Sequence, residues 1–118
     1  MSFRWREYVS LAEELCARTD APALRSSVSR AYYGAFCLCR NYFRLNHIKR
    51  GEIHKMVSQK LNDSDDPEIL IAAQYIDALF IERKKCDYEG EHIITPDNAK
   101  KLIAKAKKVI GVIDDLES

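Results

Sequence analysis

The sequence lacks long apolar runs and any stretch typical of a secretory signal. No run of about 18 apolar residues occurs in the 118-residue chain, so no transmembrane helix is predicted. The first residues, Met-Ser-Phe-Arg-Trp-Arg-Glu, contain no apolar signal core. We therefore expect a cytoplasmic protein that makes no contact with a membrane.

Glycine and proline are also scarce, and neither charge is in excess. With 4 Gly and 3 Pro, the chain has too few turn residues for a strand-rich fold with many tight turns. Lys and Arg number 19 against 18 Asp and Glu, which argues against a general nucleic-acid coat protein but leaves room for a local basic patch. Hydrophobic residues make up 47% and charged residues 31%, and these shares are typical of one folded domain spanning residues 1–118.

The four cysteines have no spacing typical of a metal site or a disulfide framework. Cys37 and Cys39 project about 200° apart on a helix, so they cannot bind one metal ion together. Without a secretory signal, Cys16 and Cys86 are also expected to be free thiols. We predict four small apolar core residues, no metal and no cofactor.

Apolar residues recur with a helical period along nearly the whole chain. Helices are predicted over residues 3–18, 21–45, 53–62, 67–90 and 96–116. Three of the helix starts combine a capping side chain with proline: Asp20 before Pro22, Asp65 or Asp66 before Pro67, and Thr95 before Pro96. The prediction is an all-α, up-and-down antiparallel bundle of four long helices and one short helix.

An arginine interrupts the apolar stripe of the fourth predicted helix. Ile69, Ile76 and Arg83 are spaced by seven residues and so project from nearly the same side. A guanidinium on a core-facing stripe is costly unless it is paired, and Asp87 lies one turn further on. The pair is either a structural clamp or part of a functional site.

The surroundings of this pair keep both interpretations open. A buried pair would fix the register of the bundle, whereas a partly exposed pair beside Lys84, Lys85 and Tyr88 would suit a phosphodiester. In catalysis Arg83 would stabilise developing negative charge. Asp87 or Tyr88 would then have to move a proton, which requires a shifted pKa.

The centre of the second predicted helix also has two interpretations. Ser27, Arg30 and Gly34 share one side, which places small residues around a single arginine. The structural interpretation is a close approach of two helices, with Arg30 paired to a carboxylate from another helix. The functional one is a shallow groove with a positive floor and a wall from Tyr32 or Tyr33, suited to a phosphate or a base. Residue chemistry alone favours the structural interpretation.

Histidines and the remaining basic residues give weaker signals. His47, His54 and His92 show no metal-ligand spacing, and each alone is typical of a solvated or capping residue. One basic cluster is a weak candidate for a phosphate patch or else a solvated surface: Arg40, Arg44, Lys49 and Arg50.

The order of four motifs resembles a known family. Ser-Arg-Ala-Tyr-Tyr-Gly-Ala-Phe occupies residues 29–36, a short helix begins with His54, Arg-x-x-x-Asp-Tyr spans 83–88, and Ile-Thr-Pro spans 94–96. Together they resemble the HEPN superfamily of small helical bundles, particularly its stand-alone prokaryotic branch. The resemblance covers about residues 5–116.

This resemblance implies a homodimer whose fourth helices meet at a shared cleft. It also implies a minimal nucleotidyltransferase as antitoxin partner, and, in active members, a metal-independent ribonuclease. Those members use an arginine and a histidine with four to six residues between them. Arg83 matches the arginine, but Tyr88, Glu89 and Gly90 occupy the positions open to the histidine. Arg30 matches the arginine of the second helix in this branch.

The resulting expectation is a toxin-like dimer that binds nucleic acid or a nucleotide and carries a degenerate ribonuclease motif. The alternative is an active endoribonuclease in which Arg83 works with His54, or with His92 of the partner subunit. Tyr88 is also a candidate acceptor for adenylylation. The residues expected to contact phosphate or RNA are Arg30, Tyr33, Lys84 and Lys85. A plain nucleotide-binding regulatory dimer is a third possibility.

Overall fold

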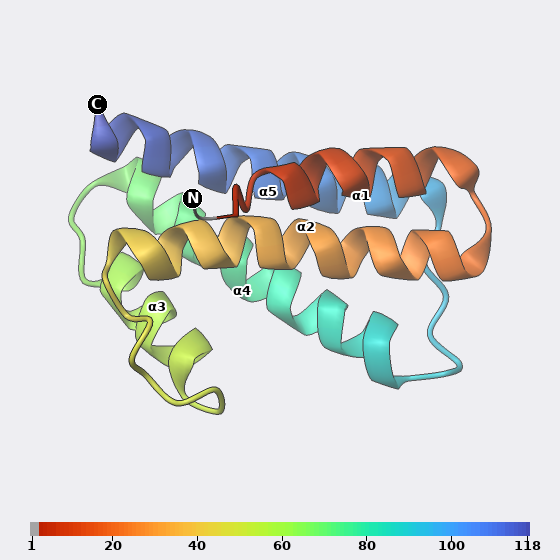
Figure 1. The fold of residues 1–118 in the computed structure, drawn as a ribbon, viewed down its shortest axis with the longest axis horizontal. Helices are drawn as coiled ribbons and strands as arrows, with labels where there is room; N and C mark the ends of the chain where they lie inside the picture. Colours follow the sequence, from red (N-terminus) through yellow and green to blue (C-terminus); the bar gives the residue numbers. More distant parts are fainter. Residues whose placement is uncertain (1–2) are drawn as a thin grey trace.

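Five helices and their connectors make up the structure, a computed structural model that describes residues 3–118 (Figure 1). They are α1 (Glu7–Arg18), α2 (Ala21–Tyr42), α3 (Ile53–Asn62), α4 (Pro67–Tyr88) and α5 (Pro96–Glu117). The prediction of an all-α bundle is confirmed. Among the described residues, no helix is long and apolar enough to cross a membrane.

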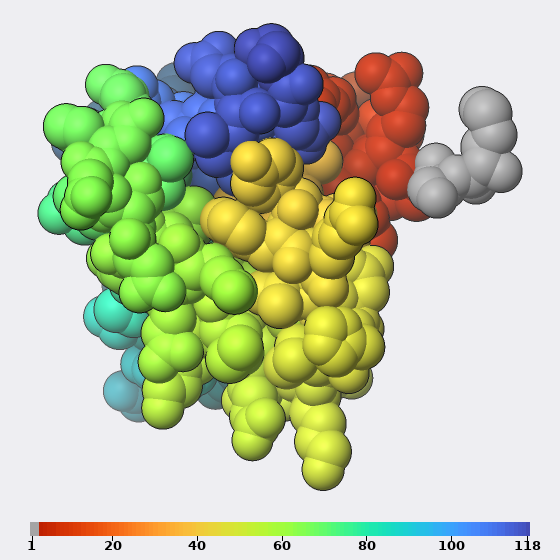
Figure 2. Space-filling model, turned by 90° about the vertical axis from the view of Figure 1, so that its left-hand side faces the viewer, coloured from red at the N-terminus to blue at the C-terminus, as the bar shows by residue number. Residues whose placement is uncertain are grey.

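The four longer helices alternate in direction along the chain. In Figure 1, α1 and α4 run away from the end that carries the C-terminus, and α2 and α5 run back toward it. α2 is the central helix and contacts all four others. The short α3 packs against α2 and α4, and Figure 2 shows it with the preceding connector below the last turns of α5. This arrangement is the antiparallel bundle that the short connectors predicted.

Side-chain caps explain three of the helix starts. At the start of α2, Asp20 Oδ2 accepts from the Ala23 amide at 3.2 Å. At the start of α4, Asp66 Oδ1 accepts from the Glu68 amide at 2.9 Å. At the start of α5, Thr95 Oγ1 accepts from the Asn98 amide at 3.1 Å. Each cap satisfies an amide that has no partner within its helix. The predicted caps are confirmed, with Asp66 rather than Asp65 as the cap of α4.

Four helix boundaries differ from the prediction: α4 ends at Tyr88 and α5 at Glu117, within two residues of the predicted ends, and two others differ by more. α1 begins at Glu7 rather than Phe3, and α2 ends at Tyr42 rather than Leu45. Arg44 has a left-handed backbone (φ 58°), and the Leu45 amide donates to the Arg40 carbonyl at 3.0 Å. This is the geometry of a Schellman ending, which usually places glycine where Arg44 lies. Burial of Leu45 stabilises the turn, and periodicity does not reveal such an ending.

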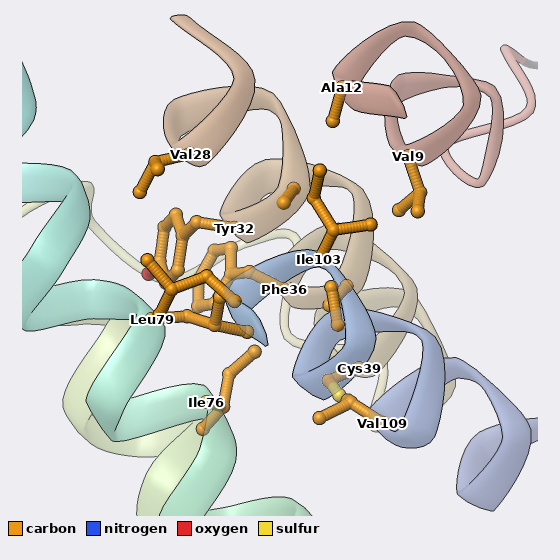
Figure 3. Packing of buried hydrophobic residues seen from close by; sticks show 14 of the residues in the cluster. Val9, Ala12, Val28, Tyr32, Phe36, Cys39, Ile76, Leu79, Ile103 and Val109 are labelled. Carbon is orange, nitrogen blue, oxygen red and sulfur yellow. The ribbon is translucent and has the colours of Figure 1, made fainter. Parts of the chain in front are cut away.

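The core lies where α2 meets α4 and α5. Tyr32 and Phe36 project from α2 beside Leu79 of α4 and Ile103 of α5 (Figure 3). The largest fully buried side chains include Tyr32, Leu61, Ile76, Leu79 and Ile113. All four cysteines are buried free thiols, as predicted.

α1 and α2 approach each other closely at Gly34. A Cβ atom at this position would lie 2.8 Å from Val9 Cγ2 and 3.1 Å from the Trp5 carbonyl oxygen. Ser27 is also fully buried, and its hydroxyl donates to the Leu24 carbonyl at 2.7 Å. The small residues of α2 therefore do permit close helix packing, and this packing holds the first turns of α1 at the edge of the site.

Candidate anion-binding groove

An open groove of about 900 Å³ runs between α2, α3, α4 and the start of α1. Four arginines line it: Arg30, Arg40, Arg50 and Arg83. Among the described lining residues, Asp87 is the one carboxylate. The whole chain carries a net charge of only +1. Positive charge is therefore concentrated in a concave surface, where it attracts anions.

The Arg83 side chain forms the floor of the groove and is only 11% exposed. Its guanidinium carbon lies 5.3–5.9 Å from the centroids of four aromatic rings: Tyr32 and Tyr33 of α2, and Phe80 and Tyr88 of α4. Ring faces attract cations, which makes an aromatic cage favourable for a guanidinium. The cage stabilises the cation without using its N–H groups.

Few of the Arg83 donors have partners within the protein. Nη1 donates one long hydrogen bond, 3.3 Å, to Asp87 Oδ2, which also accepts from Ser29 Oγ at 3.4 Å. The Arg83 Nε atom is buried and has no partner among the described residues. A buried donor without a partner costs about 1–3 kcal/mol. The Arg83–Asp87 pair is thus a loose contact in a groove wall, and it is a poor structural clamp.

Two further arginines stack on aromatic rings of the first part of the chain. Arg30 lies 4.9 Å from the Tyr8 ring centroid and Arg40 lies 5.3 Å from that of Trp5. The expectation that Arg30 pairs with a carboxylate from another helix is wrong, because no carboxylate among residues 3–118 lies within 4.0 Å of it. The stacked guanidinium of Arg30 keeps its N–H edge available for a planar or tetrahedral anion. The corresponding edge of Arg40 donates to Asn41 Oδ1, from Nε and Nη2, both at 3.2 Å.

His54 lies in the wall of the groove with both ring nitrogens occupied. Nδ1 is 2.8 Å from Tyr32 Oη and Nε2 is 2.9 Å from Asp77 Oδ1, while the ring stacks on Phe80 with centroids 3.8 Å apart. Ser58 also donates to Asp77, at 3.2 Å. The side chain is 17% exposed, so the expectation of a solvated or capping histidine is wrong at this position.

Burial changes the titration of this cluster. Burial lowers the pKa of His54 below its usual value, and hydrogen bonding to Asp77 opposes that shift only in part. Burial also raises the pKa of the Tyr32 hydroxyl far above its usual value. Both groups are therefore held in their neutral forms at neutral pH.

The structure brings most of the predicted binding and catalytic residues to the groove. Those that line it are Arg30, Tyr33, His54, Arg83, Asp87 and Tyr88. The two predicted lysines do not: Lys84 lies over the Phe80 ring and Lys85 is 3.9 Å from Glu82. His92 bonds to Glu82 at 3.1 Å and lies outside the lining, so within one chain it does not face Arg83.

Sequence reasoning missed the aromatic residues at the start of the chain. Trp5 and Tyr8 belong to the apolar side of the helix predicted over residues 3–18, and nothing in the sequence assigned them to a site, but they line the groove. Only the packing of α1 on Gly34 of α2 places them there. Of the weak basic cluster, Arg40 and Arg50 line the groove, whereas Arg44 and Lys49 do not.

No cluster of three metal-ligating side chains occurs within residues 3–118. Comparisons with protein-family profiles, curated proteins and solved structures found no match to this chain.

Proposed function

We propose that this chain is a HEPN-like domain that binds RNA or a nucleotide in the arginine-lined groove. The observation that carries the proposal is Arg83, a cation held in an aromatic cage with one long hydrogen bond. Unpaired buried polar groups in native proteins are typical of functional sites. Phosphate oxygens would supply acceptors for Arg83 Nη2, which has no hydrogen bond among the described residues and, unlike Nε, is not fully buried.

The other groove residues suit the remaining parts of a nucleotide. Arg30 presents an N–H edge that suits phosphate oxygens. Arg40 adds positive charge to the groove, although its Nε and Nη2 atoms already donate to Asn41 Oδ1 at 3.2 Å. Tyr88 is 77% exposed, so its ring can stack with a base although the Arg83 guanidinium lies over it at 5.9 Å. Arginines that hold a backbone beside aromatic rings that stack bases are typical of sites for single-stranded nucleic acid.

Metal-independent RNA cleavage is the second candidate function. It is favoured by the position of His54, which lines the same groove as Arg83. A general base needs a free lone pair close to the attacking hydroxyl, but both His54 nitrogens bond to protein groups. Binding therefore ranks above cleavage.

The resemblance adds partners to the proposal. We propose a homodimer and a minimal nucleotidyltransferase as antitoxin partner, with Tyr88 as a candidate acceptor for adenylylation. Ile81 of α4 and Ile93 of the connector that follows are apolar and more than half exposed, and we place Ile81 in the proposed dimer interface. Sedimentation of the wild type and of Ile81→Glu tests the dimer. We expect the wild type to be a dimer and Ile81→Glu to be a monomer, because the new charge would lie in the interface. A monomeric wild type would refute the proposed dimer.

Titration with tetrauridylate that has hydroxyl ends tests the binding proposal. We expect Arg83→Met to weaken binding at least tenfold, because it removes the caged cation and keeps an apolar side chain of similar length. The matched control is Lys101→Met, an exposed charge on α5 that lies outside the groove. Equal losses in both variants, or no binding by the wild type, would refute the proposal.

Incubation of the wild type with a longer labelled RNA separates binding from cleavage. If the wild type cleaves RNA and Arg83→Met does not, the protein is a ribonuclease. If the two degrade RNA equally poorly, the ribonuclease function fails and binding stands on the titration alone.

A further inference from the structure

His54 and Arg83 flank the same two aromatic rings in the groove. The guanidinium carbon of Arg83 lies 5.4 Å from the Tyr32 ring and 5.5 Å from the Phe80 ring. His54 bonds to the Tyr32 hydroxyl at 2.8 Å and stacks on Phe80 at 3.8 Å. An anion that binds Arg83 is therefore also brought close to the imidazole.

The hydrogen bonds of His54 define its protonation state in the free protein. The Asp77 carboxylate accepts, so Nε2 carries the hydrogen, and Nδ1 of the neutral ring accepts from the Tyr32 hydroxyl. When His54 takes up a proton, Nδ1 becomes a donor to Tyr32 Oη. The bond to Asp77, which the carboxylate already strengthens, remains and becomes an ion pair.

Charged and titratable groups face His54 from two helices. α2 contributes the neutral Tyr32, and α4 contributes Asp77, Arg83 and Lys84. Asp77 favours the imidazolium, while burial and the two cations oppose it. The balance favours the neutral ring, and the positive field of Arg83 contributes to it.

We propose that binding of a phosphate-bearing anion in the groove is coupled to uptake of one proton by His54. The inference rests on the proposed binding function and identifies its regulation by pH. A bound phosphate offsets the positive field of Arg83 and adds a negative charge beside the imidazole, so the charged ring becomes more favourable. The proton comes from the solvent.

The sign of the pH dependence follows from linkage. A ligand that raises the pKa of His54 binds more tightly to the protonated protein, so affinity rises as pH falls. For a shift of about one unit, affinity rises up to about tenfold between about pH 8 and the acid limit. Proton uptake is largest, about half a proton per ligand, between the pKa values of His54 in the free and the bound protein, and it vanishes well above both.

Calorimetric titration with tetrauridylate in two buffers of different ionisation enthalpy tests the coupling. The phosphodiesters and uracil rings do not titrate near pH 6, so any proton taken up enters the protein. His54→Gln keeps a donor for Asp77 and an acceptor for Tyr32 but cannot titrate. We expect this variant to lose both the proton uptake and the pH dependence of binding, whatever its affinity near pH 8.

Each result decides between the alternatives. Binding by the wild type without proton uptake near pH 6 overturns the inference and leaves the proposed function intact. Uptake that persists in His54→Gln, or that disappears in His92→Gln, assigns the proton to another group and also overturns it. Absence of binding at every pH ends both.

A spectroscopic measurement on the wild type makes the test independent of how His54→Gln folds. The imidazole signals are assigned with His47→Gln and His92→Gln, and His54 is titrated with and without tetrauridylate. We expect the ligand to raise the pKa of His54 by about half a unit to one unit. An unchanged pKa in the presence of saturating ligand overturns the inference.

Discussion

Arg83 is the residue at which the proposed binding function and stability oppose each other. Its buried Nε has no partner, and its one hydrogen bond to Asp87 is long. A guanidinium that served only stability would have satisfied donors and a close carboxylate. The aromatic cage offsets part of the cost and leaves the cation ready for a ligand.

Arg83→Met should therefore leave the free energy of unfolding unchanged or raise it by about 1 kcal/mol. The substitution removes an unpaired buried donor, and Asp87 keeps its contact with Ser29 while its side chain is 28% exposed. Urea unfolding monitored by circular dichroism measures the change. A loss above about 2 kcal/mol would show that the Arg83–Asp87 pair is a clamp after all.

At the level of the helices, the approach of α1 to α2 at Gly34 shapes the groove. The contact positions the ring of Tyr8 under Arg30 and that of Trp5 under Arg40. A larger side chain at position 34 would push α1 outward and displace both rings.

We expect Gly34→Ala to lower the free energy of unfolding by about 1–3 kcal/mol. The new Cβ atom would lie 3.1 Å from the Trp5 carbonyl oxygen, a backbone atom that cannot rotate away. The matched control is Gly111→Ala on α5. Among residues 3–118, a Cβ atom there would have nothing within 4 Å apart from its own helix backbone and chain neighbours, and its helix propensity should add about 1 kcal/mol. Parallel urea titrations compare them, and changes of the same sign would contradict the packing argument.

A second link between helices joins α2 to the end of α4. The Arg25 guanidinium donates to four carbonyl oxygens, those of Cys86, Glu89, Gly90 and His92. These carbonyls belong to the last turn of α4 and to the turn after it, where carbonyl oxygens have no amide donor within the helix. Arg25 therefore holds the connector that leads into α5.

Arg25→Met should cost about 2–3 kcal/mol of stability, because several of these carbonyls lose a charged donor. The control is Arg18→Met, whose exposed pair with Asp20 contributes little. Thermal unfolding of the two variants, followed by hydrogen exchange of the amides at 86–94, measures the effect. If both variants unfold at the same temperature, the carbonyls are satisfied by water once Arg25 is gone.

For the molecule as a whole, stability should depend on pH in two separate windows. The pKa of His54 is below its unfolded value, so its neutral form stabilises the fold above about pH 6.5 and this contribution is lost as pH falls. The pKa of Asp114 is also lowered, by the hydrogen bond from Arg6, so its contribution is lost in the more acidic range of carboxylates.

We accordingly expect the free energy of unfolding to fall between about pH 7 and pH 5, with a slope of at most about 1.4 kcal/mol per unit from one proton. His54→Gln should flatten this part of the profile and keep the loss at lower pH. Urea unfolding at a series of pH values measures both effects. A wild-type profile that is flat between pH 7 and 5 would contradict the role given to His54.

The helices were predictable because their signals are local. Asp20 and Thr95 each lie a few residues from the amides that they cap. The end of α2 was not predictable from local signals, because the left-handed backbone of Arg44 depends on the burial of Leu45 against distant residues. The site followed the same division: Arg83 and Asp87 share one helix, whereas Trp5 and Tyr8 come from a different part of the chain.

Composition and apolar period alone were enough to specify an antiparallel helical bundle with an arginine on a core-facing stripe of α4. Only the tertiary structure showed that this stripe opens into a groove, because Arg83 is surrounded by rings from α2 and α4. The tertiary structure also showed that His54 forms hydrogen bonds with both Tyr32 and Asp77. Local patterns report which side of a helix is apolar. Partners from other helices determine the hydrogen bonds and charges around a buried side chain, and these govern its chemistry.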